Sequence, residues 1–211
     1  MKTRAIKQAI KKTAFYKWYV DRRDALDEQR SNQPRALFAD QILPKNGIGA
    51  ELGVFKGDFS ATLMDRTSAR QIHLIDPWYF LTAYWHWGSG DRSTVHALIK
   101  ILQRFEKDIE GGRVRVHVGD DRQILTIFPD QYFDWVYMDS SHLYEHTRDE
   151  LQILTSKVKA SGVIAGDDWQ PDPSHRHHGV YKAVTELVAS GKYEIFYADN
   201  NDRQWAIRMK S

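Results

Sequence analysis

The chain has 211 residues, a formal net charge of +2 and no cysteine. This length suits one sizeable core, the near-neutral charge gives no reason to expect nucleic acid as a partner, and the lack of cysteine excludes disulfides, a thiolate nucleophile and a zinc–thiolate site. A cytoplasmic protein without an integral membrane segment is expected, because the apolar runs are too short for a membrane span and the N-terminus lacks the apolar region of a signal peptide.

The first 44 residues are predicted to form a helical extension. Residues 3–30 indicate a helix with an apolar stripe at Ile6, Ile10, Ala14 and Trp18, and a second helix is predicted over residues 35–42, ending before Pro44. The opposite face of the first helix is basic, with Lys7, Lys11, Lys12, Arg22 and Arg23. Such a face either makes weak contact with a membrane surface or an acidic partner, or is the solvated side of a packing helix.

Residues 45–211 are predicted to form a single domain in which strands and helices alternate. Strands are expected at residues 48–54, 71–75, 113–118, 134–138 and 163–165, and helices at residues 59–66, 94–109, 122–127, 144–157 and 180–190. Two last strands, residues 193–197 and 204–209, flank a polar turn. The pattern predicts an α/β fold, a Rossmann-like three-layer sandwich with a mostly parallel seven-stranded sheet and an antiparallel strand in the terminal hairpin.

Acidic residues follow two of the apolar strands. Asp139 comes after the strand at residues 134–138, and Asp167 and Asp168 come after the strand at residues 163–165. The carboxyl ends of parallel strands meet at one edge of the sheet, where three carboxylates would repel each other unless a cation lay between them. Oxygen ligands favour Mg²⁺, with Mn²⁺ as the alternative, and His142 could act as a base beside the ion. The competing interpretation is that the acids cap a helix and that His142 is an ordinary surface residue.

Earlier strand ends carry a second set of candidates for ligand binding. Glu51 is followed by Gly53 and Gly57, and an acid there suits a cationic, amino-bearing ligand better than a phosphate. Asp76 is placed to bind ribose hydroxyls. Asp120 or Asp121 could accept a hydrogen bond from an adenine amino group. Each of these candidates also has a structural interpretation. The glycines could form a tight turn, Asp76 could start an Asp-Pro turn, and Asp120 or Asp121 could be a helix N-cap.

Two segments are candidates for covering a substrate. Residues 77–90 are rich in aromatic side chains and end in Gly88 and Gly90, which favours a lid over a buried helix. Residues 169–178 contain three histidines that could suggest a softer metal, but the prolines and adjacent acids favour an ordinary loop that contacts substrate.

The segments ELGVFKG, LIDPW, VGDD, DWVYMDSSHLYEHTRDEL and GVIAGDDW make the chain similar to class I S-adenosylmethionine-dependent methyltransferases. More narrowly, it resembles the metal-dependent group that includes macrocin-type sugar O-methyltransferases. The resemblance covers roughly residues 45–210. It implies that Glu51, Gly53 and Gly57 shape the methionine end of the cofactor site, that Asp76 holds the ribose and that Asp120 or Asp121 holds the adenine. It also implies that Asp139, Asp167 and Asp168 bind Mg²⁺, with Asp139 bordering the cofactor as well, and that His142 is the catalytic base.

The function expected from this resemblance is transfer of a methyl group from S-adenosylmethionine to a hydroxyl of a small molecule, a sugar or another vicinal diol. Catechol-like phenols are the competing acceptor class. A nicotinamide-dependent oxidoreductase fits less well, because G-x-G-x-x-G is missing after the first strand. A non-catalytic protein that binds S-adenosylmethionine is the remaining alternative. The sequence leaves the oligomeric state open, and a homo-oligomer is compatible with it.

Overall fold

The computed structural model describes residues 33–78 and 92–210. The predicted helix over residues 3–30 and most of the aromatic segment at residues 77–90 therefore lie outside the described part of the chain. No helix within that part is long and apolar enough to cross a membrane.

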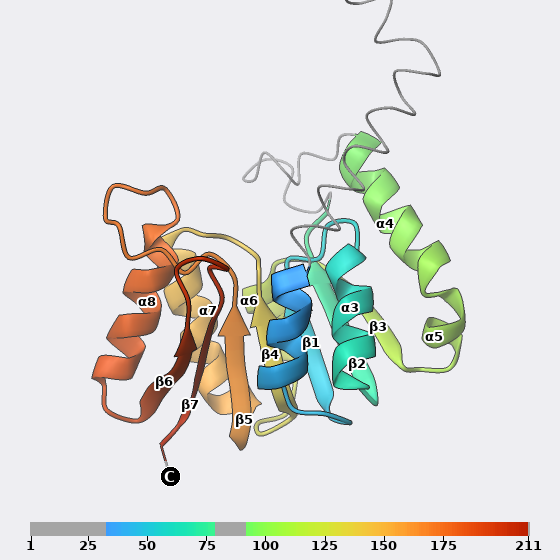
Figure 1. The fold of residues 1–211 in the computed structure, drawn as a ribbon. Coiled ribbons are helices and arrows are strands. Elements are labelled where there is room, and N and C mark those ends of the chain that lie inside the picture. Colours follow the sequence, from blue (N-terminus) through green and yellow to red (C-terminus); the bar gives the residue numbers. More distant parts are fainter. Residues whose placement is uncertain (1–32, 79–91, 211) are drawn as a thin grey trace, which may run out of the picture.

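The described strands form a seven-stranded sheet in the order β3-β2-β1-β4-β5-β7-β6 (Figure 1). The pairs formed by β1 with β2 and β4, by β2 with β3 and by β4 with β5 are parallel, whereas β7 runs antiparallel to both β5 and β6. This confirms the predicted fold class. The strands are β1 (Ile48–Leu52), β2 (Gln71–Asp76), β3 (Val114–Val118), β4 (Phe133–Met138), β5 (Val158–Gly166), β6 (Tyr193–Ala198) and β7 (Trp205–Met209).

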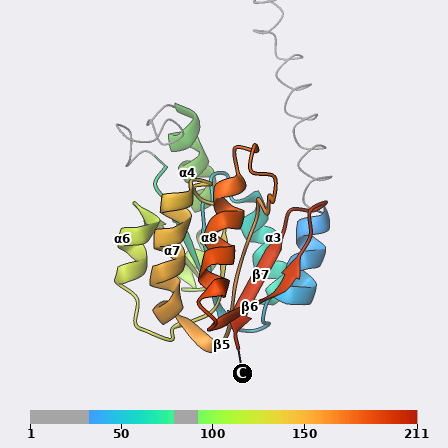
Figure 2. The same cartoon turned by 90° about the vertical axis from the view of Figure 1, so that its left-hand side faces the viewer.

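Helices cover both faces of the sheet, and each face has its own apolar core. On one face lie a helix over residues 33–42, drawn in blue in Figure 1, and the helices that follow β1 and β2; on the other lie the helices that follow β3, β4 and β5 (Figure 2). Strand residues alternate between the two cores, as in Trp135 and Val136 of β4. The labelled helices are α3 (Asp58–Thr67), α4 (Arg92–Arg104), α5 (Glu106–Glu110), α6 (Asp121–Thr126), α7 (Tyr144–Lys157) and α8 (His178–Ala189).

The strand register brings the carboxyl ends of the central strands to one level. Leu52 at the end of β1 pairs with Ile75 of β2 on one side and with Met138 of β4 on the other, and Met138 pairs with Gly166 of β5. The residues that follow these strands therefore share one edge of the sheet, at the point where the strand order reverses.

Two predicted elements differ most from the structure, and the first strand, predicted over residues 48–54, ends at Leu52. The helix predicted over residues 94–109 is divided into α4 and α5 at Phe105, whose buried side chain joins the core while the backbone leaves the α-helical conformation. The strand predicted at residues 163–165 begins earlier, at Val158, because Val158 pairs with Phe133 before a register shift in the pairing with β4. Lys159, Ala160 and Ser161 in that half are partly or fully exposed, so the half does not show a continuous apolar pattern.

Candidate functional site

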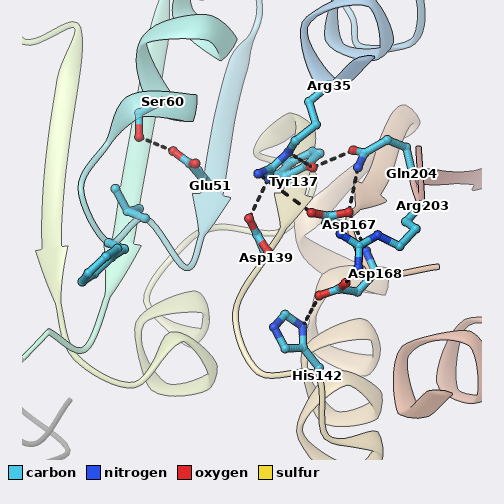
Figure 3. A network of polar contacts seen from close by, with 12 residues as sticks. Arg35, Glu51, Ser60, Tyr137, Asp139, His142, Asp167, Asp168, Arg203 and Gln204 are labelled. Carbon is cyan, nitrogen blue, oxygen red and sulfur yellow. Dashed lines mark hydrogen bonds and ion pairs between the residues drawn. The ribbon is translucent and has the colours of Figure 1, made fainter. Parts of the chain in front are cut away.

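The carboxyl group of Glu51 near the end of β1 is almost completely buried. The hydroxyl group of Ser60 on α3 donates a hydrogen bond to it (Figure 3). Burial raises the pKa of Glu51 to about 8, although this hydrogen bond partly offsets the effect. The side chain is therefore mostly protonated at neutral pH, and a cationic group bound beside it would favour the ionised form.

Asp76 at the end of β2 holds the loop between β1 and α3. Its Oδ2 accepts hydrogen bonds from the backbone N–H groups of Val54 and Phe55, both at 2.9 Å, and its Oδ1 accepts one from Trp78 at 2.6 Å. Burial raises the pKa of Asp76 against the effect of these hydrogen bonds. Asp76 thus shapes the loop, whatever it contributes to ribose binding.

Trp78, the first tryptophan of the aromatic segment, packs inside the protein. Its side chain is buried, and its indole N–H donates a hydrogen bond to the carbonyl oxygen of Phe55 at 2.9 Å. The residue stiffens the same loop that Asp76 holds.

The structure gives a steric reason for glycine at position 53 that is separate from ligand binding. Its φ is +83°, and a Cβ at this position would lie 2.1 Å from the carbonyl oxygen of Asp139. The space beside Gly53 is thus filled by the backbone of Asp139. Gly57 also has a positive φ, of +75°, and is the N-cap of α3.

The two acids predicted to hold adenine are both engaged with other side chains. Asp120 caps α6 and forms an ion pair with Arg122 at 2.6 Å, and Asp121 lies 2.9 Å from Nε2 of His146. The pKa of His146 is raised to about 10, because Asp121 and Glu150 outweigh the opposing effect of burial. The N-cap alternative therefore describes Asp120 in this structure, and adenine binding by either acid stays a prediction.

Asp168 lies between two histidines. Its Oδ2 is 2.9 Å from Nδ1 of His142 and its Oδ1 is 2.8 Å from Nδ1 of His177, and the two imidazole rings lie 4.2 Å apart (Figure 3 shows the contact with His142). Burial lowers the pKa of His142, but the hydrogen bond to Asp168 and its negative charge outweigh this and raise the pKa overall. His142 keeps 33 % of its side chain exposed, so it can meet a bound molecule.

Asp139 and Asp167 share one arginine. Arg35, on the helix over residues 33–42, places Nη2 2.6 Å from Asp139 and Nη1 3.8 Å from Asp167 (Figure 3). Its Nε donates a hydrogen bond to the hydroxyl oxygen of Tyr137 at 3.1 Å, and its guanidinium lies 4.0 Å from the ring centre of Phe59. Although burial opposes the charge, Tyr137 and the two carboxylates raise the pKa of Arg35. Burial raises the pKa of Asp167 to about 6, although Arg35 offsets part of this.

Gln204, which lies just before β7, and Trp205, its first residue, also contact Asp167. The side-chain amide of Gln204 donates a hydrogen bond to Asp167 at 2.8 Å and its carbonyl accepts one from the hydroxyl of Tyr137 at 2.6 Å. The indole of Trp205 donates to the backbone carbonyl of Asp167 at 2.9 Å. The terminal hairpin therefore fixes the orientation of the Asp167 carboxylate.

Comparison with known proteins identifies the family. The sequence pattern of a methyltransferase domain family matches residues 50–169, more than half of the chain. The chain belongs to this methyltransferase family. No curated protein matches it in sequence.

Solved structures share the fold of this methyltransferase at low sequence identity. The SAH-bound methyltransferase PaMTH1 of Podospora anserina is 16 % identical, with a TM-score of 0.58 over 78 % of this chain and 72 % of that one. A proposed S-adenosyl-L-methionine-dependent methyltransferase of Methanococcus maripaludis is 16 % identical, with a TM-score of 0.60 over 87 % and 89 %. SMU.1697c of Streptococcus mutans, a proposed methyltransferase in complex with SAH, is 14 % identical, with a TM-score of 0.54 over 83 % and 94 %.

The three carboxylates predicted to bind Mg²⁺ do not converge on one point in this methyltransferase. Ligands of an octahedral Mg²⁺ lie about 2.1 Å from the ion and thus about 3 Å from their neighbours. Among the described residues, Asp139, Asp167 and Asp168 do not place one oxygen each within 4.8 Å of one another, whereas Asp168 does so with His142 and His177. This arrangement does not fit the predicted magnesium site, because Arg35 lies beside two of the acids and two histidines lie beside the third.

Sequence reasoning missed several residues that complete the site. Arg203 places Nη1 3.4 Å from Asp168, and like Arg35 and Gln204 it belongs to a segment for which the sequence predicts only structure. Nothing in the local pattern of these three residues indicates that they reach the acids. His177 was noted within the histidine-rich segment, but not as a partner of Asp168. These contacts join distant segments, and Arg35 and Asp139 are more than a hundred positions apart. A local motif could therefore not reveal them.

Proposed function

We propose that this methyltransferase transfers a methyl group from S-adenosylmethionine to a hydroxyl oxygen of a small molecule, with His142 as the general base. The observation that carries the proposal is the close pair of His142 and Asp168, with Nδ1 2.9 Å from Oδ2, at the sheet edge where α/β proteins bind their ligands (Figure 3). An imidazole whose Nδ1 donates to a carboxylate presents its other nitrogen, Nε2, as a proton acceptor.

The cofactor site is proposed to lie at the ends of β1, β2 and β3. A buried Glu51 with a raised pKa suits the ammonium group of a methionine moiety, and Asp76 holds the adjacent loop in place. Gly53, Gly57, Asp120, Asp121 and Asp139 are proposed to border the same site, as the resemblance in sequence implies. The SAH-bound structures with the same fold support S-adenosylmethionine as the methyl donor.

The chemistry requires few steps from the protein. S-adenosylmethionine supplies an electrophilic methyl group on a sulfonium. His142 would remove the proton of the acceptor hydroxyl through Nε2 as the oxygen bonds to the methyl carbon and the carbon–sulfur bond breaks. Asp168 would hold the imidazole in the correct tautomer and stabilise the imidazolium that forms. Because the cofactor is already activated, alignment and proton removal are the main contributions expected from the chain.

The acceptor class is carried over from the sequence as a proposal. A sugar or another vicinal diol is the first candidate, and a catechol-like phenol is the competing one. A cytoplasmic location and the oligomeric state stay predictions. The magnesium or manganese site predicted at Asp139, Asp167 and Asp168 is not carried over, because Arg35 and two histidines lie beside these acids.

A methyl-transfer screen with S-adenosylmethionine and hydroxylated acceptors tests the proposal. His142→Ala should lower turnover by roughly 10²- to 10⁴-fold, the usual contribution of a positioned base, and leave the affinity for the cofactor unchanged. His96→Ala, which removes an exposed histidine of α4, is the matched control and should keep full activity. Methylation confined to nitrogen acceptors, or full turnover in His142→Ala, would refute it.

A further inference from the structure

We propose that Arg35 is a built-in cation that takes the place of a divalent metal ion between Asp139 and Asp167. The inference rests on the proposed function, because that function makes this site an active site. Its test is metal binding at the two carboxylates, which can be measured without turnover.

The contacts of Arg35 define a complete binding site for a guanidinium. Its three nitrogens face three different groups: Nη2 faces Asp139, Nη1 faces Asp167 and Nε donates to the hydroxyl of Tyr137 (Figure 3). The flat face of the same group lies over the ring of Phe59 at 4.0 Å. With its side chain only 17 % exposed, Arg35 has lost most of its contact with water and is held by protein groups instead.

This placement competes directly with a metal ion. An ion bound by Asp139 and Asp167 would need the carboxylate oxygens that face the guanidinium, and its two charges would repel the arginine. Moving Arg35 aside would leave its charge without these partners in a largely buried position, which is costly. The remaining acid of the predicted triad, Asp168, is already paired with His142 and His177, so it does not supply a third ligand to this position.

A permanent cation would perform the electrostatic part of a metal's task. It places a positive charge against two neighbouring carboxylates close to the proposed base, and it does so without depending on the concentration of an ion in solution. It would not, however, bind the acceptor through open coordination positions, as a metal would. Acceptor orientation must then come from protein side chains such as Asp139, whose carboxylate is 23 % exposed.

Binding of Mn²⁺, measured by electron paramagnetic resonance on the full-length protein, tests the inference. The readout is binding that depends on Asp139, obtained by comparing each protein with its Asp139→Asn counterpart. Wild-type protein should show no such binding. Arg35→Met should gain a site that Asp139→Asn removes, and it should bind Mn²⁺ at least tenfold more tightly than the wild type or its own Asp139→Asn counterpart. Arg35→Lys, which keeps the charge, should resemble the wild type. Mn²⁺ should also raise the melting temperature of Arg35→Met and not that of the wild type.

Asp139-dependent Mn²⁺ binding by the wild-type protein would overturn the inference, and so would a folded Arg35→Met protein that gains no site. If Arg35→Met does not fold, the wild-type and Arg35→Lys measurements decide alone. Methyl transfer by the wild type in the presence of a chelator should persist. Absence of methyl transfer under every condition would refute the proposed function and leave the metal-binding result intact, so the two failures can be told apart.

Discussion

The buried acids of this methyltransferase differ in charge because their neighbours differ. Glu51 has a hydroxyl group beside it, and burial raises its pKa to about 8. Asp168 lies between two histidines, which lower its pKa although burial acts in the opposite direction. The sheet edge therefore combines an acid that is mostly neutral at pH 7 with one that is ionised, and the difference follows from the partners of each carboxyl group.

Glu51 should make the protein less stable as the pH rises. Its pKa is higher in the folded protein than in the unfolded chain, so the folded state binds more protons between about pH 4.5 and pH 8 and stability falls across that range. Glu51→Gln should reduce this fall, while the part that Asp167 and Glu150 contribute remains, and it should be more stable than the wild type above pH 8 by about 2–4 kcal/mol. Urea unfolding at several pH values measures the effect. Glu110→Gln, at an exposed position, is the control; an identical pH profile for wild type and Glu51→Gln would show that Glu51 ionises freely.

Gly53 should be required for folding rather than only for ligand binding. Both Gly53 and Gly191 have positive φ, but a Cβ at 53 would collide with the carbonyl of Asp139, whereas a Cβ at 191 meets nothing within 4 Å. Gly191→Ala should cost about 1–2 kcal/mol from backbone conformation alone. Gly53→Ala should cost about 3 kcal/mol or more beyond that, because strands β1 and β4 must separate. Denaturant unfolding of the two variants gives the comparison, and equal losses would contradict the predicted clash.

At the scale of elements, the helix over residues 33–42 joins the core and the site. Phe38 is buried, and its ring lies 5.0 Å from that of Tyr197 and 6.3 Å from that of Tyr137, while Arg35 of the same helix reaches the acids. The position of Arg35 therefore depends on apolar packing one turn away. The helix was predicted as part of an N-terminal extension, yet its apolar side belongs to one of the two cores of the sheet.

Phe38→Ala should thus affect both stability and activity. Loss of the buried ring should lower the free energy of unfolding by about 3–5 kcal/mol. Turnover measured well below the new melting temperature should fall as well, because the helix that carries Arg35 loses its anchor. Leu37→Ala on the same helix removes a side chain that is 60 % exposed, and it should change neither quantity. Unchanged turnover in folded Phe38→Ala would mean that Arg35 keeps its place without this packing.

At the scale of the whole molecule, the order and type of the described elements could be predicted because each has a strong local pattern. The alternation of apolar strands with amphipathic helices determines the parallel sheet, and the polar turn at residues 199–202 indicates the final hairpin. The position of the acids at one edge also follows, since parallel strands end on the same side. Element ends were less predictable, as Phe105 and the first half of β5 show.

The partners of the acids could not be predicted in this way. An acid after a strand is compatible with a metal, an arginine or a histidine as its neighbour, and the choice depends on which distant segment the fold brings close. Arg35 and Asp139 are 104 positions apart, and Gln204 and Asp167 are 37 apart. The sequence therefore indicated where negative charge collects but not what balances it.

The proposed cofactor site and the residues around Asp168 come from different segments of the chain, which has a consequence for engineering this protein. The proposed cofactor side comes from β1, β2 and the loop that Asp76 holds, whereas Asp168, His177, Arg203 and Gln204 come from the loop after β5 and the start of β7. These two C-terminal segments contact each other, since the N–H of Trp169 donates to the carbonyl of Arg203 at 2.8 Å. They form a unit that could be exchanged with the corresponding segments of a relative, and acceptor choice could then change while the methyl donor stays the same.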